Sequence, residues 1–235
     1  VSPYLIANAA DLGKVWLRPD ACYQLANNLD LSGISWSNAV ISSFTGIFDG
    51  RGFVISPLLI DQKSIDCIGL FGLTFDATIQ DLGVVEVNIT GGGYVGGLAG
   101  SMDSGRIKSC YATGSVNGSK YCTGGLVGRS SGTIEFCYSG GAVSGDYSVG
   151  GLVGEIDSGH ITACNASGSV RGHSQVGGLA GHNGEGRISS SFALEFVKGY
   201  SYIGGLCGWN SGCISQTYAS GGLTKGVSAG GLCGY

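Results

Sequence analysis

The stretch that decides the fold is residues 150–176, which read GGLVGEIDSGHITACNASGSVRGHSQV. Its opening string, Gly-Gly-Leu-x-Gly, begins at Gly96, Gly124, Gly150, Gly177, Gly204 and Gly230. A degenerate copy, Ile68-Gly-Leu-Phe-Gly72, precedes the first of these. The interval is roughly 27 residues, a period typical of repeat proteins in which each unit packs only on its neighbours.

Each unit carries short apolar segments separated by turns that contain glycine. The segments are rich in Val, Ile, Tyr and Cys, which favour strands, and none is long enough for a helix. Three strands and three turns in a fixed period predict one coil of an all-β, parallel β-solenoid (β-helix). We expect about seven coils, stacked about 4.8 Å apart and right-handed by the usual crossover rule.

Stacking aligns equivalent residues into columns along the rod. The leucines of the repeated string form one column, which we expect to be interior, and Cys110, Cys137 and Cys164 form a second. Ile107 and Cys110 are an odd number of residues apart, so a straight strand would turn them to opposite faces. Because both residue types favour burial, we predict a bend between them. That bend directs the aromatic residue after each cysteine outward.

Residues 1–67 lack the repeat, and we interpret them as an irregular N-terminal cap and first coils continuous with a repeat solenoid over residues 68–235. Strand patterns occur at 4–6, 22–25 and 54–60, and Asp11-Leu12 is expected to open a short helix that ends before Pro19. Residues that recur on every coil more often stabilise the stacking of the coils than take part in catalysis. An active site is therefore expected where the repeat breaks, and the clearest break is this cap.

Composition excludes several classes of partner. Glycine is 46 of 235 residues, charged residues are 12%, and the net charge is −4. No cluster of Lys and Arg is present to bind nucleic acid. No run of 18 apolar residues predicts insertion into a membrane.

The repeat resembles the bacterial GLUG motif, here as Gly97-Leu-Ala-Gly100 and Gly151-Leu-Val-Gly154, and residues 44–50 resemble the segment that often precedes such repeats. The resemblance implies a secreted or cell-surface protein, because these repeats occur in adhesin-like proteins and in non-catalytic parts of immunoglobulin-A-cleaving metallopeptidases. The zinc motif His-Glu-x-x-His of those peptidases is missing: the histidines are His160, His173 and His182. The protease activity therefore does not carry over.

Two surface columns are candidate ligand sites, and no catalytic residue is assigned. The first is a ladder that would stack on glycan: Tyr111, Tyr138, Phe192 and Tyr218. Its rings have an apolar face and, for tyrosine, a polar tip, although the more ordinary role of such rings is to stabilise the ladder or cover the core. The second is an acidic turn edge, Asp103, Asp157 and Glu185. Such acids are ordinary turn residues, but they could also hold calcium or serve glycoside hydrolysis.

No other metal or cofactor is expected. The nine cysteines contain no Cys-x-x-Cys pair. Cys207 and Cys233 occupy the same register in adjacent coils, within reach of a disulfide, whereas the Cys110 column is expected to hold free buried thiols.

Three functions remain open from the sequence. The first is a structural or adhesive module that binds glycan or a host or surface protein through an exposed column. The second is a carbohydrate-active enzyme, a polysaccharide lyase or glycosidase. The third is a filament subunit, because the chain stops partway through a unit and an unpaired strand edge would recruit another copy.

Overall fold

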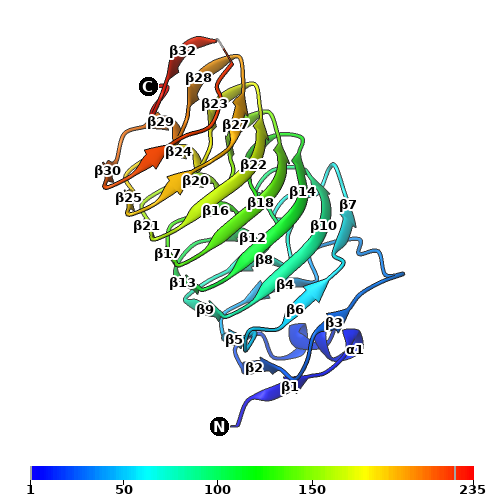
Figure 1. Ribbon diagram of the computed structural model, residues 1–235. Coiled ribbons are helices and arrows are strands. Elements are labelled where there is room, and N and C mark those ends of the chain that lie inside the picture. The colour runs from blue at the N-terminus through cyan, green and yellow to red at the C-terminus, as the bar shows by residue number, and fades with distance from the viewer. Residues whose placement is uncertain (1, 225) are drawn as a thin grey trace.

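The computed structural model describes residues 2–224 and 226–235. It is a parallel β-solenoid of about eight coils, with the N-terminus at one end of the rod and the C-terminus at the other (Figure 1). The all-β solenoid predicted from the repeat is therefore confirmed. No helix in the described part of the chain is long and apolar enough to cross a bilayer.

Each full coil contains four strands, so the prediction of three segments was wrong. The coil at 105–130 has β13 (Gly105–Lys108), β14 (Tyr111–Gly118), β15 (Tyr121–Gly124) and β16 (Val127–Ser130). Only Gly125 and Leu126 separate β15 from β16. The Gly-Gly-Leu string, which resembles a plain turn, is thus flanked by a strand on each side.

The four strands of successive coils build four parallel sheets, named I to IV in chain order within a coil. Sheet I contains β1 (Tyr4–Ile6), β2 (Cys22–Leu25), β5 (Ile47–Asp49), β9 (Ala77–Gln80), β13, β17 (Thr133–Glu135), β21 (His160–Thr162), β25 (Arg187–Ser189) and β30 (Cys213–Ser215). Sheet II contains β3 (Leu29–Asp30), β6 (Val54–Ser56), β7 (Leu59–Asp61), β10 (Gly83–Gly91), β14, β18 (Tyr138–Ser144), β22 (Asn165–Arg171), β26 (Phe192–Ala193), β27 (Phe196–Lys198) and β31 (Tyr218–Ala219). Its long strands β10, β14, β18 and β22 lie side by side across the middle of Figure 1.

The other two sheets follow within each coil. Sheet III contains β11 (Val95–Gly96), β15, β19 (Tyr147–Gly150), β23 (Ser174–Gly177), β28 (Ser201–Gly204) and β32 (Val227–Gly230). Sheet IV contains β4 (Ile41–Phe44), β8 (Phe71–Thr74), β12 (Ala99–Met102), β16, β20 (Val153–Ile156), β24 (Ala180–Asn183) and β29 (Cys207–Asn210).

The last glycine of each Gly-Leu-x-Gly string lets sheets III and IV pack directly on each other. A Cβ placed on Gly154 would lie 2.5 Å from both the carbonyl oxygen of Gly128 and the amide nitrogen of Thr123. Real Cβ atoms do not come this close to backbone. The motif therefore requires glycine here because two backbones, and no side chain, fill the space.

A left-handed residue makes the predicted bend between Ile107 and Cys110. Ser109 has φ 51°, and both flanking side chains are buried. The same conformation recurs one coil later at Phe136, with φ 53°. This bend turns the chain from sheet I into sheet II while both side chains stay in the core, so that prediction is confirmed.

The two predicted interior columns lie in the core. The leucines of the repeated string are fully buried from Leu98 to Leu206, while Leu232, in the last coil, is 40% exposed. The thiols of Cys110, Cys137 and Cys164 are free. The sulfurs of Cys137 and Cys164 accept from the backbone of the coil before: Cys110 N donates to Cys137 Sγ, and Cys137 N donates to Cys164 Sγ, both at 3.4 Å. The expectation of free buried thiols in this column is confirmed.

The N-terminal end of the core is covered by α1 (Ala9–Leu12) and a 3₁₀ turn (Val15–Leu17), seen at the bottom of Figure 1. Leu12 of the helix and Val15 of the 3₁₀ turn are fully buried against this end of the core. The helix closes, rather than opens, at Asp11-Leu12, because the Asn8 side chain caps its start and accepts from Asp11 N at 3.0 Å. The predicted strand at 54–60 is split into β6 and β7 around Pro57.

Candidate functional site

The predicted aromatic ladder is aligned by its backbone, but its rings do not form a continuous stack. Tyr111, Tyr138, Asn165, Phe192 and Tyr218 pair in register on the outward side of sheet II. Phe192 and Tyr218 stack, with centroids 4.9 Å apart and planes 4° from parallel. Tyr111 instead covers Gly83 of the preceding coil, and the Tyr138 hydroxyl bonds Ser167 Oγ at 2.9 Å. Half of the ladder thus covers the sheet, and its role in binding stays a prediction.

The predicted acidic edge lies at the turns after sheet IV, but its carboxylates are separated. Asp157 pairs with Arg129 at 2.6 Å, and Asp103 accepts from Ser101 Oγ at 3.2 Å. Glu185 is exposed and lies one residue beyond the position aligned with Asp157, because Gly184 N bonds Ile156 O. Among residues 2–224 and 226–235, no group of three His, Cys, Asp or Glu residues is placed to hold a metal ion.

Cys207 and Cys233 pair as neighbours in adjacent coils at the C-terminal end of sheet IV, as their register predicts. Both are free thiols in the structure. Burial raises the pKa of both thiols, which disfavours the thiolate that disulfide exchange needs. The bridge between them stays a prediction.

A cluster of Cys122, Glu155 and His182 lies on the outward side of sheets III and IV. Cys122 Sγ donates to Glu155 Oε2 at 2.8 Å, and His182 Nδ1 lies 3.7 Å from Glu155 Oε1. Interaction with His182, together with the thiol hydrogen bond and nearby Arg129, holds the pKa of Glu155 below its ordinary value. Sequence reasoning missed this cluster because its members come from three different coils.

The cluster is not built as a nucleophilic site. Cys122 is only 3% exposed. Burial is the larger cause that raises the pKa of its thiol, and the negative charge of Glu155 is the second. A nucleophilic cysteine requires the opposite, a lowered pKa beside an imidazole that takes its proton. Here the carboxylate stands between thiol and imidazole, so the thiol acts as a hydrogen-bond donor.

A second residue that the sequence did not reveal is Glu195. Its position lies 27 residues after Gly168, the last of the column Gly114, Gly141 and Gly168. The side chain is 2% exposed, its Oε1 lies against Gly151, and its Oε2 has no hydrogen-bond partner. Burial raises the pKa of this carboxyl to about 9. The only signal in the sequence is a charge where the repeat has glycine.

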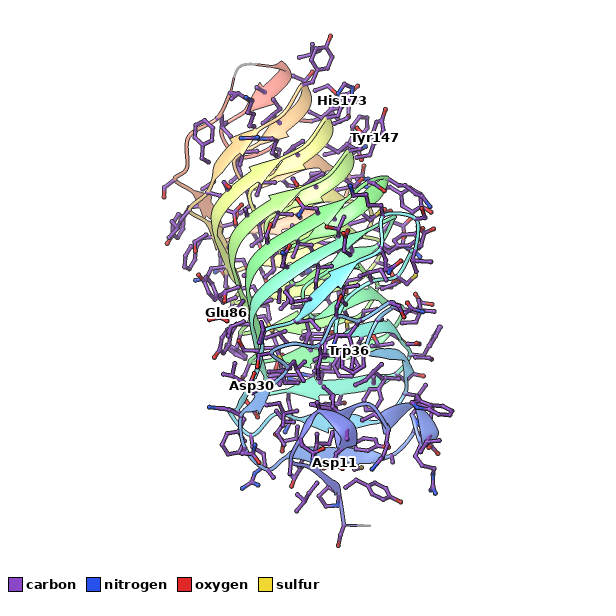
Figure 2. The ribbon with its side chains drawn as sticks, turned by 90° about the vertical axis from the view of Figure 1, so that its right-hand side faces the viewer. Asp11, Asp30, Trp36, Glu86, Tyr147 and His173 are labelled. Carbon is purple, nitrogen blue, oxygen red and sulfur yellow. The ribbon has the colours of Figure 1, made fainter. Side chains whose placement is uncertain are left out.

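The most exposed row of rings runs along the boundary between sheets II and III, at the start of the sheet III strands or in the turn just before them. This ring edge consists of Tyr121, Tyr147, His173 and Tyr200. Tyr147 is 49% and Tyr200 62% exposed. His173 meets Tyr147 edge-on at 5.9 Å and stacks on Tyr200 at 5.2 Å, with planes 7° apart. Figure 2 shows Tyr147 and His173 together on one edge of the rod, pointing away from it.

The ring edge is held rigidly by backbone bonds between coils. His173 N donates to Asp146 O at 2.8 Å, and Tyr200 N donates to His173 O at 3.0 Å. Gly172, just before His173, lies against the side chains of Val149 and Val176, so the turn is seated on a small apolar core. A signal was present in the sequence, because each ring stands three or four residues before a Gly-Gly-Leu string.

Two hollows in the surface adjoin the ring edge. One, of about 440 Å³, is lined in part by Ser144, Asp146, Arg171 and His173. The other, of about 220 Å³, extends over sheet II and is lined in part by Ser144, Arg171, Phe196 and Lys198. They share Ser144 and Arg171, so they lie next to each other, and together we call them the depression.

The fold and its columns define a repeat protein, a parallel β-solenoid with its variable side chains on the outside. The sequence profile of the GLUG motif matches residues 91–117 and 145–171. The chain therefore contains GLUG repeats at these two segments, and the resemblance to GLUG-repeat proteins seen in the sequence is confirmed.

The chain is similar to halomucin and to two solved immunoglobulin A1 protease structures, among others. Halomucin of Haloquadratum walsbyi is 35% identical over 134 residues, which is 50% of this chain but 2% of halomucin. The structure of a putative immunoglobulin A1 protease from Bacteroides ovatus superposes with a TM-score of 0.74 and 20% identity, over 97% of this chain and 77% of that one. A second structure, named IgA1 protease, gives a TM-score of 0.68 and 17% identity, over 99% of this chain and 20% of that one. At these identities the two structures establish the fold alone.

Proposed function

We propose that this chain is a structural and adhesive module of a secreted or cell-surface protein, and that it binds glycan through the ring edge. The observation that carries the proposal is the row of exposed rings at Tyr121, Tyr147, His173 and Tyr200, aligned along the rod. The similarity to halomucin, of which the matched segment is 2%, supports a place within a much larger protein.

The geometry of the ring edge suits a polymer better than a small ligand. Rings recur coil after coil, about 4.8 Å apart along the rod, so a chain of sugars lying parallel to the axis meets several of them. Each ring offers an apolar face for the C–H face of a sugar and a polar tip for its hydroxyls. The coil-to-coil bonds of His173 and Tyr200 fix the backbone in advance, which lowers the ordering entropy lost on binding.

The ring edge is favoured over the ladder of Tyr111, Tyr138, Phe192 and Tyr218 because more of its ring surface is free. Tyr111 and Tyr138 lie down on the glycines of sheet II. Tyr147, at the start of β19, and Tyr200, in the turn before β28, extend into solvent beside the depression.

The test is binding of the purified chain to a panel of immobilised polysaccharides, compared with a Tyr147→Ala/Tyr200→Ala double variant. Two lost rings should weaken binding at least about tenfold, since each aromatic contact contributes on the order of 1 kcal/mol. Phe136→Ala is the matched control, because that ring is 59% exposed but lies at the turn between sheets I and II. A Phe192→Ala/Tyr218→Ala arm tests the ladder.

Three results would contradict the proposal. The first is an absence of binding to every polysaccharide in the panel. The second is equal loss in the Phe136→Ala control. The third is loss confined to the Phe192→Ala/Tyr218→Ala arm, which would move the site to the ladder. Capture of a protein with no dependence on Tyr147 and Tyr200 would assign the adhesive role to a different surface.

A further inference from the structure

A pair of cationic side chains lies beside the ring edge, and their mutual repulsion destabilises the chain unless an anion binds between them. Arg171 on β22 and Lys198 on β27 pair in register on adjacent parallel strands, and both side chains are exposed. Like charges directly opposite each other on neighbouring strands repel. The chain has only 12 Lys and Arg residues and a net charge of −4, so this pair is not an effect of a basic composition.

Among the described residues, several other cations are paired with an acid, although Arg51, Lys63 and Arg187 have no ion pair either. Arg106 pairs with Glu135, Lys120 with Asp66 at 2.8 Å, and Arg129 with Asp157 at 2.6 Å. Within residues 2–224 and 226–235, no acid lies within ion-pair distance of Arg171 or Lys198. Their positive charge is therefore directed at solvent, over the hollow that they line.

The cations lie near the ring edge because Arg171 lines both hollows of the depression. Arg171 lines both hollows, with His173 at one end, and Phe196 and Lys198 at the other. Phe196 is 52% exposed and adds a further ring to the floor. Asp146 is the acid that lines the depression, on the His173 side. An anion is thus best accommodated at the Lys198 end, farther from that carboxylate.

We propose that the glycan held at this surface is acidic, with its carboxylate or sulfate groups seated on Arg171 and Lys198 and its sugar rings on Phe196 and the ring edge. The planar guanidinium of Arg171 offers parallel N–H donors that match the paired oxygens of either group. The ammonium of Lys198 supplies a second charge one strand away. This inference rests on the proposed function and names the substrate class of the same site.

The test compares matched polymers that differ only in charge. Dextran sulfate against dextran reports sulfate recognition, and polygalacturonate against its methyl ester reports carboxylate recognition. The wild-type chain should bind at least one anionic polymer about tenfold more tightly than its neutral partner. That preference should fall as salt rises, because exposed charges are screened beyond about 8 Å at physiological ionic strength.

An Arg171→Gln/Lys198→Gln variant should lose the preference for the anionic polymer and keep the weaker binding to the neutral one. The control is Lys14→Gln/Arg187→Gln, which changes the net charge equally at two exposed sites outside the depression. Far-ultraviolet circular dichroism of each variant checks that the solenoid is intact.

The outcomes separate this inference from the function on which it rests. Equal binding of neutral and anionic polymers, still lost in Tyr147→Ala/Tyr200→Ala, overturns the acidic assignment and leaves the glycan site. If the Lys14→Gln/Arg187→Gln control loses the preference for the anionic polymer to the same extent, the preference comes from net charge alone, and the acidic assignment is again overturned. Duplex DNA bound as tightly as either anionic polymer, with the same dependence on Arg171 and Lys198, overturns the assignment to glycan.

Discussion

Replacing Glu195 by glutamine should make the solenoid more stable at neutral pH. In the folded chain this carboxyl is buried, lacks a partner for Oε2 and keeps its proton up to a pH of about 9, because burial raises its pKa. In the unfolded chain it releases the proton above its ordinary pKa of 4.5. The unfolded state therefore gains stability relative to the folded state as the pH rises between these values.

The magnitude follows from that window. Each pH unit in it is worth about 1.4 kcal/mol. The contribution of Glu195 is fully present below pH 4.5 and is lost as the pH rises towards 9. At pH 7, roughly 2.5 pH units into the window, the loss is about 3 kcal/mol. Glutamine has nearly the same shape and no proton to lose. The variant and wild-type curves should coincide near pH 4.5 and separate above it.

The assay is urea unfolding at several pH values between 4.5 and 8, followed by far-ultraviolet circular dichroism. The quantity of interest is the difference in unfolding free energy between Glu195→Gln and wild type, because other titrating groups cancel in it. Glu185→Gln is the control, since it makes the same chemical change at an exposed position ten residues away. Its difference from wild type supplies the background that is subtracted from the Glu195→Gln difference at each pH.

Two results would refute the reasoning. One is a difference between Glu195→Gln and wild type that stays constant from pH 4.5 to 8, which would mean that the carboxyl is ionised and solvated when folded. The other is a glutamine variant less stable than wild type at pH 7. That result would mean that the folded chain stabilises the ionised Glu195 carboxylate through an interaction with its negative charge.

Three further outcomes are expected. Gly178→Ala should destabilise the chain by several kcal/mol in urea unfolding, because a Cβ there would overlap the carbonyl oxygen of Gly205. Gly231→Ala changes the same motif position where nothing lies within 4 Å, so it should leave stability unchanged. Equal effects of the two substitutions would refute the steric explanation. Alkylation of the native chain, followed by mass spectrometry, should modify exposed Cys213 and spare buried Cys137; early labelling of Cys137 would contradict the packing. Glu155→Gln should destabilise the chain at pH 7 and lose that effect below the ordinary carboxyl pKa of 4.5, since the lowered pKa of Glu155 contributes stability only while it is ionised; a pH-independent effect would argue against it.

The interior was predictable because its columns repeat. The leucine column and the thiols of Cys110, Cys137 and Cys164 are interior positions on every coil, and their spacing alone places them together. The bend at Ser109 was predictable in existence, since two apolar residues at odd spacing must both be buried. Its left-handed conformation was not, because Ser109 and its equivalent Phe136 share no residue type that favours it.

The surface was less predictable because it does not repeat. The rings of the ring edge shift by one residue between Tyr147 and His173, so no single register selects them, and contact depends on which way each turn faces. The ladder of Tyr111 and Tyr138 is periodic and was easier to find, yet those rings lie down on glycines of the sheet. Glu195 resembled a surface residue between Leu194 and Phe196, and only the structure places it inside.

Direct packing of sheet III on sheet IV, through glycines such as Gly154, makes the rod extensible in whole units. The steric partners of each glycine are backbone atoms, which are the same in every coil whatever side chains the coil carries. Duplication or deletion of one 27-residue unit, between equivalent glycines, restores the same contacts and changes the rod's length by one strand spacing, about 4.8 Å. Reach and surface chemistry can therefore vary independently in such a protein.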